Sequence, residues 1–345
     1  MSRRAVTLLI AGIGALACLV IVFAVPVPYV ALLPGPTYNT LGPLDGKPVI
    51  QISGHRSYTA PGHLNMVTVS YIGGPGANPP FNIFAALQAW LSPHEAVVPQ
   101  EELFPPGQTQ QQVVKQDSEQ MVNSQETAQA AALCQLGIKF KTIDTISGTI
   151  SGLPAAGRLH RGDVITAVDG KPVSCKSSAS IMIRARPVGN RVVLTIDRGG
   201  EHHTIALRTA SYKGEPVIGV NVVESFKFPF HVKINIGNVG GPSAGMMFAL
   251  AIIDKLTPRN LTGGKFIAGT GEIEVNGAVD PIGGIQQKMA AARAAGATVF
   301  LAPAANCSDT AGSVPAGLRV VKVSTLRGAI AALNAMKAGK AVPGC

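Results

Sequence analysis

The chain has 345 residues, of which 46% are hydrophobic and 14% charged, and its formal net charge is +10. This length suggests about two domains, and the apolar fraction excludes an intrinsically disordered protein, which combines high charge with few apolar residues. The positive charge is spread thinly, with no run of five Lys or Arg, so we expect no nucleic-acid partner.

The first predicted element is a membrane-spanning helix at residues 5–25, which contain no charged residue. A helix of this length spans about 31 Å at roughly 1.5 Å per residue, enough to cross a hydrocarbon core. Arg3 and Arg4 precede it and no charge follows before Asp45, so residues 1–25 are predicted to form a cytoplasmic N-terminus and a single span of the cytoplasmic membrane. The rest of the chain is then extracytoplasmic. A cleaved signal peptide is the alternative, but its apolar region would usually be shorter and end at a small-residue cleavage site.

Cysteine usage agrees with an extracytoplasmic location. Cys18 lies in the predicted span, and the remaining cysteines are Cys134, Cys175, Cys307 and Cys345. Four cysteines allow three pairings, and the domain division proposed below favours Cys134–Cys175 and Cys307–Cys345. Four free thiols are the alternative. The absence of C-x-x-C and of a Cys/His cluster predicts no metal site.

Residues 26–44 are rich in Pro and Gly and are interpreted as a linker. Residues 45–137 are interpreted as a mixed region of strands and helix that could be part of a catalytic fold. Within it, the Gln- and Ala-rich, Pro-free segment 108–136 predicts a helix, for which Gly137 is a plausible C-cap.

Residues 138–211 have the pattern of a β-rich module, including a hairpin formed by residues 192–197 and 203–208. Residues 153–173, with a Pro-Ala-Ala-Gly turn, Gly-Asp before a strand and Asp-Gly after it, resemble a PDZ domain. The resemblance implies a groove where an extended peptide adds a strand to a sheet edge. The apolar-Gly-apolar sequence Leu136, Gly137 and Ile138 is a candidate carboxylate-binding loop, with helix termination at Gly137 as the alternative.

Residues 212–345 alternate strands and helices. Strands are predicted at 216–223, 231–236, 298–301 and 318–323, with helices at 243–256 and 285–295 and a final helix ending near Gly339. Asn276-Gly277 between apolar runs predicts a hairpin. The overall fold class is therefore α+β, with an N-terminal transmembrane helix.

The sequence Gly-Pro-Ser-Ala-Gly around Ser243 matches G-x-S-x-G, the nucleophile pattern of many hydrolases. No His follows Ser243, so the Ser-Asp-His order is excluded, and His231 is an unattractive base. A lysine can act as the base if burial lowers its pKa from about 10.4 towards roughly 7–8. Lys288, near the start of an alanine-rich helix, has better surroundings than Lys255 or Lys265.

Several ordered blocks between residues 231 and 303 resemble the proteolytic domain of the Lon protease family. They are Gly-Pro-Ser-Ala-Gly, Gly-Thr-Gly-Glu-Ile at 269–273, Pro-Ile-Gly-Gly-Ile at 281–285 followed by Lys288, and Ala-Ala-Gly before a strand ending in Ala-Pro. The resemblance implies a catalytic dyad of Ser243 as nucleophile and Lys288 as general base, with Thr270 orienting the lysine. The turn that contains Gly241 and Ala244 is expected to support an oxyanion at a helix N-terminus.

Two features depart from that family. Gly240 stands where Asp is usual, and no G-x-x-x-x-G-K-[ST] phosphate loop is present. The three modules together resemble membrane-anchored bacterial PDZ-containing Lon-like proteases. This resemblance implies an ATP-independent serine endopeptidase without a cofactor, with polypeptide substrates, the bilayer and a homo-oligomeric ring as expected partners. A catalytically inactive PDZ adaptor and an esterase of small substrates are the alternatives.

Overall fold

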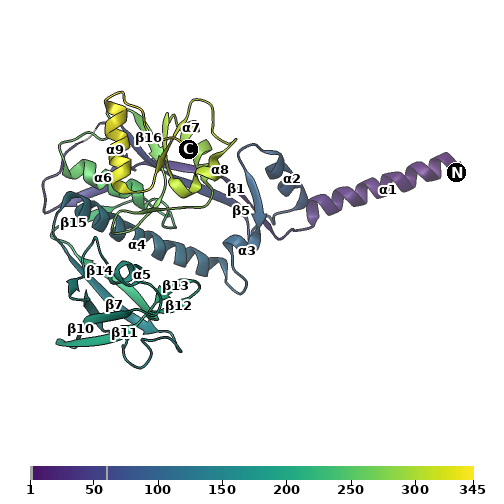
Figure 1. Ribbon diagram of the computed structural model, residues 1–345. Helices are drawn as coiled ribbons and strands as arrows, with labels where there is room; N and C mark the ends of the chain where they lie inside the picture. Colours follow the sequence, from purple (N-terminus) through teal and green to yellow (C-terminus); the bar gives the residue numbers. More distant parts are fainter. Residues whose placement is uncertain (1–2, 60) are drawn as a thin grey trace.

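The computed structural model describes residues 3–59 and 61–345, which form an N-terminal helix, a larger α/β unit and a smaller β-rich unit (Figure 1). Helix α1 (Arg3–Ala24) projects away from both units, and none of its residues is buried. It is long and apolar enough to cross a membrane. Residues 1 and 2 of the expected cytoplasmic N-terminus and residue 60 of the expected 45–137 region lie outside the described residues.

The larger unit is built on a six-stranded sheet with the order β20-β19-β16-β5-β1-β6. These strands are β1 (Tyr29–Asn39), β5 (His63–Gly73), β6 (Ala96–Pro99), β16 (Phe266–Gly269), β19 (Val299–Pro303) and β20 (Arg319–Val323). β5, β16, β19 and β20 are mutually parallel, whereas β1 is antiparallel to both of its neighbours. Every residue of β19 is buried, as expected for an internal parallel strand covered on both faces.

The prediction of a linker at residues 26–44 is wrong for β1. The apolar residues at its start pair with β5 on one side and β6 on the other. Pro34 and Pro36, which favoured a linker, fall at a shift of the β1–β5 register between Pro34 and Thr37. A residue without an N–H is tolerated at such an irregularity, since the regular ladder is already interrupted there.

The helices of the larger unit cover this sheet and include α4, which comes from the 45–137 region. They are α2 (Ile83–Leu91), α3 (Gln100–Leu103), α4 (Gln110–Leu136), α6 (Gly245–Leu256), α7 (Ile285–Ala294), α8 (Cys307–Thr310) and α9 (Leu326–Lys337), with a 3₁₀ turn at Ala304–Asn306. Helix α4 begins with a capping box between Thr109 and Gln112 and ends at Gly137, whose φ is +72°. Its buried residues share one hydrophobic core with α6 and α9.

Short strands complete the larger unit as three two-stranded ribbons. The pairs are β2 (Pro43–Leu44) with β3 (Lys47–Pro48), β4 (Ile50–Ser53) with β15 (His231–Ile234), and β17 (Glu272–Ile273) with β18 (Val279–Asp280). The β17–β18 pair confirms the hairpin predicted at Asn276-Gly277.

The β-rich unit contains a sheet of order β11-β10-β8-β7-β14, with β9 paired to β8. Its elements are β7 (Lys141–Thr149), β8 (Val164–Val168), β9 (Lys171–Pro172), α5 (Ala179–Arg184), β10 (Arg191–Arg198), β11 (Glu201–Arg208), β12 (Ala210–Tyr212), β13 (Glu215–Val217) and β14 (Val220–Lys227). The β10–β11 hairpin confirms the prediction for that segment. β14 follows the predicted boundary at residue 211 but pairs with β7 along its length, so the sheet of the β-rich unit extends beyond that residue.

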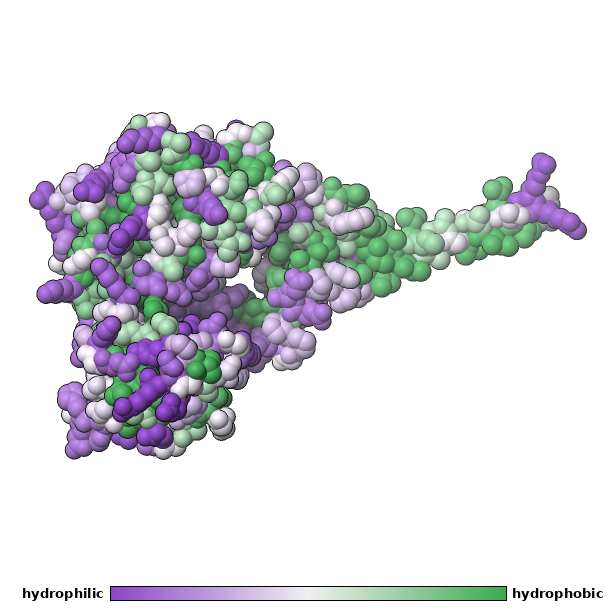
Figure 2. Space-filling view, in the orientation of Figure 1, coloured by the Kyte–Doolittle hydropathy of each residue, from purple (hydrophilic) through white to green (hydrophobic). Residues whose placement is uncertain are grey.

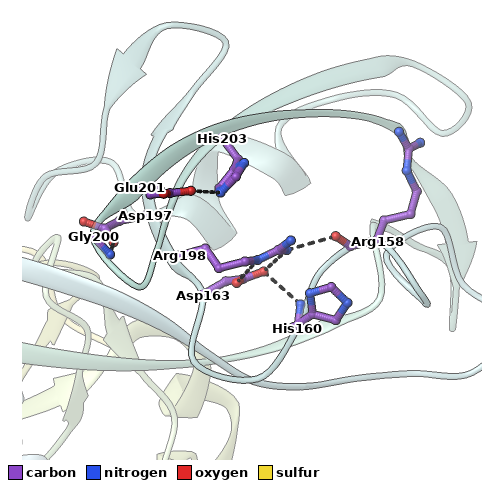
Figure 3. A network of polar contacts seen from close by, with 8 residues as sticks. All are labelled: Arg158, His160, Asp163, Asp197, Arg198, Gly200, Glu201 and His203. Atoms are coloured by element: carbon purple, nitrogen blue, oxygen red, sulfur yellow. Dashed lines mark hydrogen bonds and ion pairs between the residues drawn. The ribbon is translucent and has the colours of Figure 1, made fainter.

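A polar network joins the turn before β8 to β10 (Figure 3). The Asp163 carboxylate accepts two hydrogen bonds of 2.7 Å from Arg198 and one of 2.8 Å from the backbone N–H of His160. The hydrogen bond from Arg198 is the main reason that the pKa of Asp163 lies below its ordinary value. All its hydrogen-bond partners belong to the unit itself, so this network is structural.

Both expected disulfides are present. Cys134–Cys175 joins the last turn of α4 to the β-rich unit, and Cys307–Cys345 joins α8 to the C-terminal residue. The first bond ties the two units together beside the point where the chain passes from one to the other.

Candidate active site

Ser243 lies in the tight turn before α6, and its side chain is partly exposed. The local structure requires glycine on both sides of the serine. Gly241 has a φ of +82°, a conformation that L side chains rarely adopt. A Cβ on Gly245 would lie 2.7 Å from Ile273 Cγ2, so the residue after Ala244 must be small for α6 to approach β17. The G-x-S-x-G pattern therefore reports close backbone packing around the serine.

Helix α4 holds this turn from the other side. The backbone N–H of Gly241 donates to the carbonyl of Asp117 at 2.9 Å, and the Ser124 hydroxyl donates to the carbonyl of Pro242 at 2.9 Å. A Cβ on Gly240 would lie 2.6 Å from Asp117 Cβ, so any residue larger than Gly at this position would have to displace the serine turn or α4. The departure from the family pattern at this position thus has a steric cause in this chain.

Lys288 is the residue that α7 directs at the serine. Its Nζ lies 2.9 Å from Ser243 Oγ and 3.4 Å from Thr270 Oγ1. The residue is only 4% exposed, and burial lowers its pKa from 10.5 to about 8. Among the described residues, no carboxylate lies within 4.0 Å of Nζ to stabilise the ammonium form. The surroundings therefore favour a neutral amine next to a hydroxyl.

Thr270, which is fully buried directly after β16, is the second hydroxyl beside this amine. Its hydroxyl donates to the backbone carbonyl of Ser243 at 2.9 Å. A hydroxyl has one proton to donate, so towards Lys288 the Thr270 oxygen acts as an acceptor. A neutral amine that donates an N–H to Thr270 keeps its lone pair available for the proton of Ser243.

The start of α6 provides donors for an anion. Within the described residues, the backbone N–H groups of Ser243 and Ala244 donate no hydrogen bond, whereas that of Met246 donates to Gly271 O at 3.0 Å. Both free N–H groups lie at a helix N-terminus, where the helix dipole favours negative charge. A carbonyl oxygen that becomes negative beside Ser243 would find its donors here.

The other bases considered from the sequence are not placed at the serine. His231 in β15 and Lys265 before β16 are exposed, and Lys255 lies in the last turn of α6. None of them is hydrogen-bonded to Ser243 in the described part of the chain.

Leu136, Gly137 and Ile138 do not form the carboxylate-binding loop that was considered. The N–H of Gly137 bonds to the carbonyls of Cys134 and Leu133, and the N–H of Ile138 bonds to Leu133 O at 2.9 Å. These bonds terminate α4, so the groups that would bind a carboxylate are already used. Leu136 and Ile138 pack against the core of the larger unit.

A surface cavity of about 360 Å³ adjoins the nucleophile turn and has no signal in the sequence. It is lined by Gln120, Asn123, Ser124, Thr127, Pro242, Glu272 and Ile273. The pKa of Glu272 is raised, mainly by burial and to a smaller extent by the nearby charges of Asp280 and Glu274. The lining comes from α4, the serine turn and β17, three segments that only the fold brings together.

Comparisons with known proteins agree with this geometry. Residues 213–333 match the Lon protease (S16) C-terminal proteolytic domain, and residues 134–209 match the PDZ domain. The chain is 35% identical over 127 residues to the Lon protease of Roseiflexus castenholzii, a match that covers 36% of this chain and 16% of that protein. It is 32% identical over 154 residues to Lon protease 1 of Bacillus subtilis, covering 43% and 20%. The match therefore spans a fifth or less of these two relatives.

Among solved structures, the PDZ domain of an SdrC-like protein from Listeria monocytogenes is 27% identical, with a TM-score of 0.21, and covers 23% of this chain and 86% of that chain. The family match at residues 213–333 places a proteolytic domain in the larger unit. More specifically, the chain combines a Lon-type proteolytic domain and a PDZ domain with an N-terminal apolar helix.

Proposed function

We propose that this protein is a serine endopeptidase whose catalytic dyad is Ser243 and Lys288. The observation that carries the proposal is the 2.9 Å separation between Lys288 Nζ and Ser243 Oγ in a site where burial lowers the lysine pKa to about 8. An amine with this pKa is neutral in an appreciable fraction of molecules near neutral pH and can act as a general base.

The proposed reaction proceeds through an acyl-enzyme. Lys288 takes the hydroxyl proton as Ser243 Oγ attacks the peptide carbonyl carbon, and the oxyanion accepts hydrogen bonds from the N–H groups of Ser243 and Ala244. The C–N bond then breaks as Lys288 returns the proton to the leaving amine, which leaves an ester on Ser243. Water hydrolyses this ester with Lys288 again as the base, which regenerates the hydroxyl and releases the acid product.

The proposal includes a membrane tether and an extracytoplasmic active site. Helix α1 has the length and composition of a span, and Arg3 and Arg4 precede its apolar part. Two disulfides join the remaining cysteines, as is usual in oxidising compartments. Because the 345 residues contain no phosphate-binding loop motif, cleavage is proposed to need no ATP.

The PDZ domain is proposed to hold polypeptide at a sheet edge. β14 is an edge strand, and Ser178 at the start of α5 lies close enough to Glu224 in β14 to affect the pKa of that carboxyl, which places this edge near the helix. An extended segment would add to β14 through main-chain hydrogen bonds. This replaces the site first considered at the end of α4.

The test uses the full chain in detergent micelles with an unfolded protein as substrate. Ser243→Ala should reduce cleavage to background, and Lys288→Ala should lower kcat by about 10²–10⁴-fold. Lys265→Ala is the matched control, because that lysine is exposed, and it should cleave like wild type. Wild-type cleavage should be the same with and without ATP and Mg²⁺.

The outcomes separate the alternatives. Peptide binding without turnover by any variant would favour a PDZ adaptor, and turnover of short esters but not of protein would favour an esterase. A protease added outside intact cells should digest the large domain; protection from it would refute the proposed orientation.

A further inference from the structure

Helix α2 directs its small apolar side chains towards the protein and its large apolar side chains outward. Its small residues Ala85, Ala86 and Ala89 face inward, where they pack with Ala31 and Phe81. Its large residues face outward, with exposed fractions of 46% for Phe84, 47% for Leu87, 72% for Trp90 and 78% for Leu91. A helix that borders water normally places polar residues on its outer face.

The outward face of α2 is continuous with the end of the apolar helix α1. The rings of Phe84 and Phe23 are 4.7 Å apart, and the Asn82 amide donates to the carbonyl of Phe23 at 2.9 Å. The N–H of Val27 donates to Phe81 O at 2.8 Å. Figure 2 shows the hydrophobic surface of α1 running onto the adjoining part of the molecule. The position of α2 is therefore set by the point at which α1 ends.

The segment that contains α2 is a long uncharged stretch of the sequence. No Asp, Glu, Lys or Arg occurs between Arg56 and Glu95, so the outer face of α2 and its flanking loops are uncharged. Trp is enriched at the interface between lipid headgroups and acyl chains, and Trp, Phe and Leu form the apolar face of helices that lie there. Charged side chains, by contrast, are costly to desolvate in that layer.

We propose that α2 lies in the interfacial layer of the lipid bilayer, with Phe84, Leu87, Trp90 and Leu91 directed towards the acyl chains. This inference rests on the proposed membrane tether and adds a second, non-spanning contact. Interfacial helices bury an apolar face to a depth of roughly 5–10 Å below the headgroups. Because α2 packs on β1 and β6, this contact sets the orientation of the proteolytic sheet relative to the membrane.

The test uses Trp90, which is the only tryptophan in the chain. The full chain is inserted into vesicles of phosphatidylcholine and phosphatidylglycerol, with and without bromine on the upper acyl carbons. If α2 lies in the interface, brominated lipid should remove most of the Trp90 emission, and aqueous iodide should have little effect. The double variant Leu87→Ser with Leu91→Ser should lose most of the lipid quenching.

A matched control is Val223→Ser, because Val223 is a 55% exposed apolar residue on the PDZ sheet. It should leave lipid quenching of Trp90 unchanged. Resistance of the chain to alkaline carbonate extraction reports separately whether α1 spans the bilayer. Trp90 reached by iodide and not by brominated lipid, in a chain that resists extraction, would overturn the interfacial helix and leave the tether intact. Protection from both quenchers would also overturn it, because a second protein copy would then cover α2.

Discussion

Replacing Lys288 with Met should stabilise the protein at neutral pH, because it removes a buried amine that is protonated in most molecules at that pH. Burial lowers the pKa of Lys288 from 10.5 to about 8, and at roughly 1.36 kcal/mol per pH unit this corresponds to a penalty of about 3 kcal/mol for the charged form. Lys288 is 4% exposed, so solvent screening reduces this figure little. Methionine is similar in length and has no charge to desolvate.

The pH dependence is the decisive part of this prediction. Below about pH 8, Lys288 is protonated in both the folded and the unfolded state, so the wild type bears the full penalty. Between about pH 8 and about pH 10.5 only the unfolded state holds the proton, so the free energy of unfolding of the wild type rises with pH. The stability advantage of Lys288→Met should therefore decline by about 3 kcal/mol over this range. Hydrogen bonds lost with the amine add an offset that does not depend on pH.

The measurement is urea unfolding of both full-length proteins in detergent micelles, followed by circular dichroism at several pH values. Groups other than Lys288 titrate equally in the two proteins and cancel in the comparison. A difference between the variants that stays constant from about pH 7 to about pH 10 would refute the argument that burial lowers the pKa of this lysine.

The remaining predictions concern catalysis. For wild type, kcat/KM should rise about tenfold per pH unit below about pH 8 and level off above it, as the amine of Lys288 loses its proton; a flat profile in a fluorogenic peptide assay would contradict this. Thr270→Val should lower kcat about tenfold through loss of one hydrogen bond, and Thr270→Ser should restore it. Gly240→Ala should shift the serine turn at a cost of about 1–3 kcal/mol and reduce kcat, because its Cβ meets Asp117 Cβ. Adding Asp117→Gly should recover kcat, and failure to do so would exclude the steric explanation.

The proximity of Ser243, Lys288 and Thr270 could be predicted from the sequence, because several motif blocks occur in the right order and spacing. Their catalytic roles stay predictions until the variants are measured. The contacts of α4 with the serine turn could not be foreseen. Asp117 and Ser124 lie more than a hundred residues before Pro242, and no local pattern records a contact over that separation.

Errors arose where one local pattern is compatible with two structures. The apolar-Gly-apolar sequence around Gly137 is shared by binding loops and helix ends, and the hydrogen bonds of Ile138 decide for a helix end. The strand predicted at 216–223 is divided between β13 and β14, and strand periodicity does not say which sheet a strand joins: the partner of β14 is β7. The prolines of β1 indicated a linker. They are tolerated in the strand because they lie at a register shift against β5, and the sequence of β1 alone does not show where its neighbour shifts register.

The position of β1 limits how the large domain could be released from the proposed membrane anchor. Helix α1 ends at Ala24 and β1 begins at Tyr29, so only residues 25–28 separate the span from an internal strand. A protease that cut within these residues would shed an intact six-stranded sheet. A cut beyond Tyr29 would remove backbone partners from both β5 and β6 and break the sheet apart.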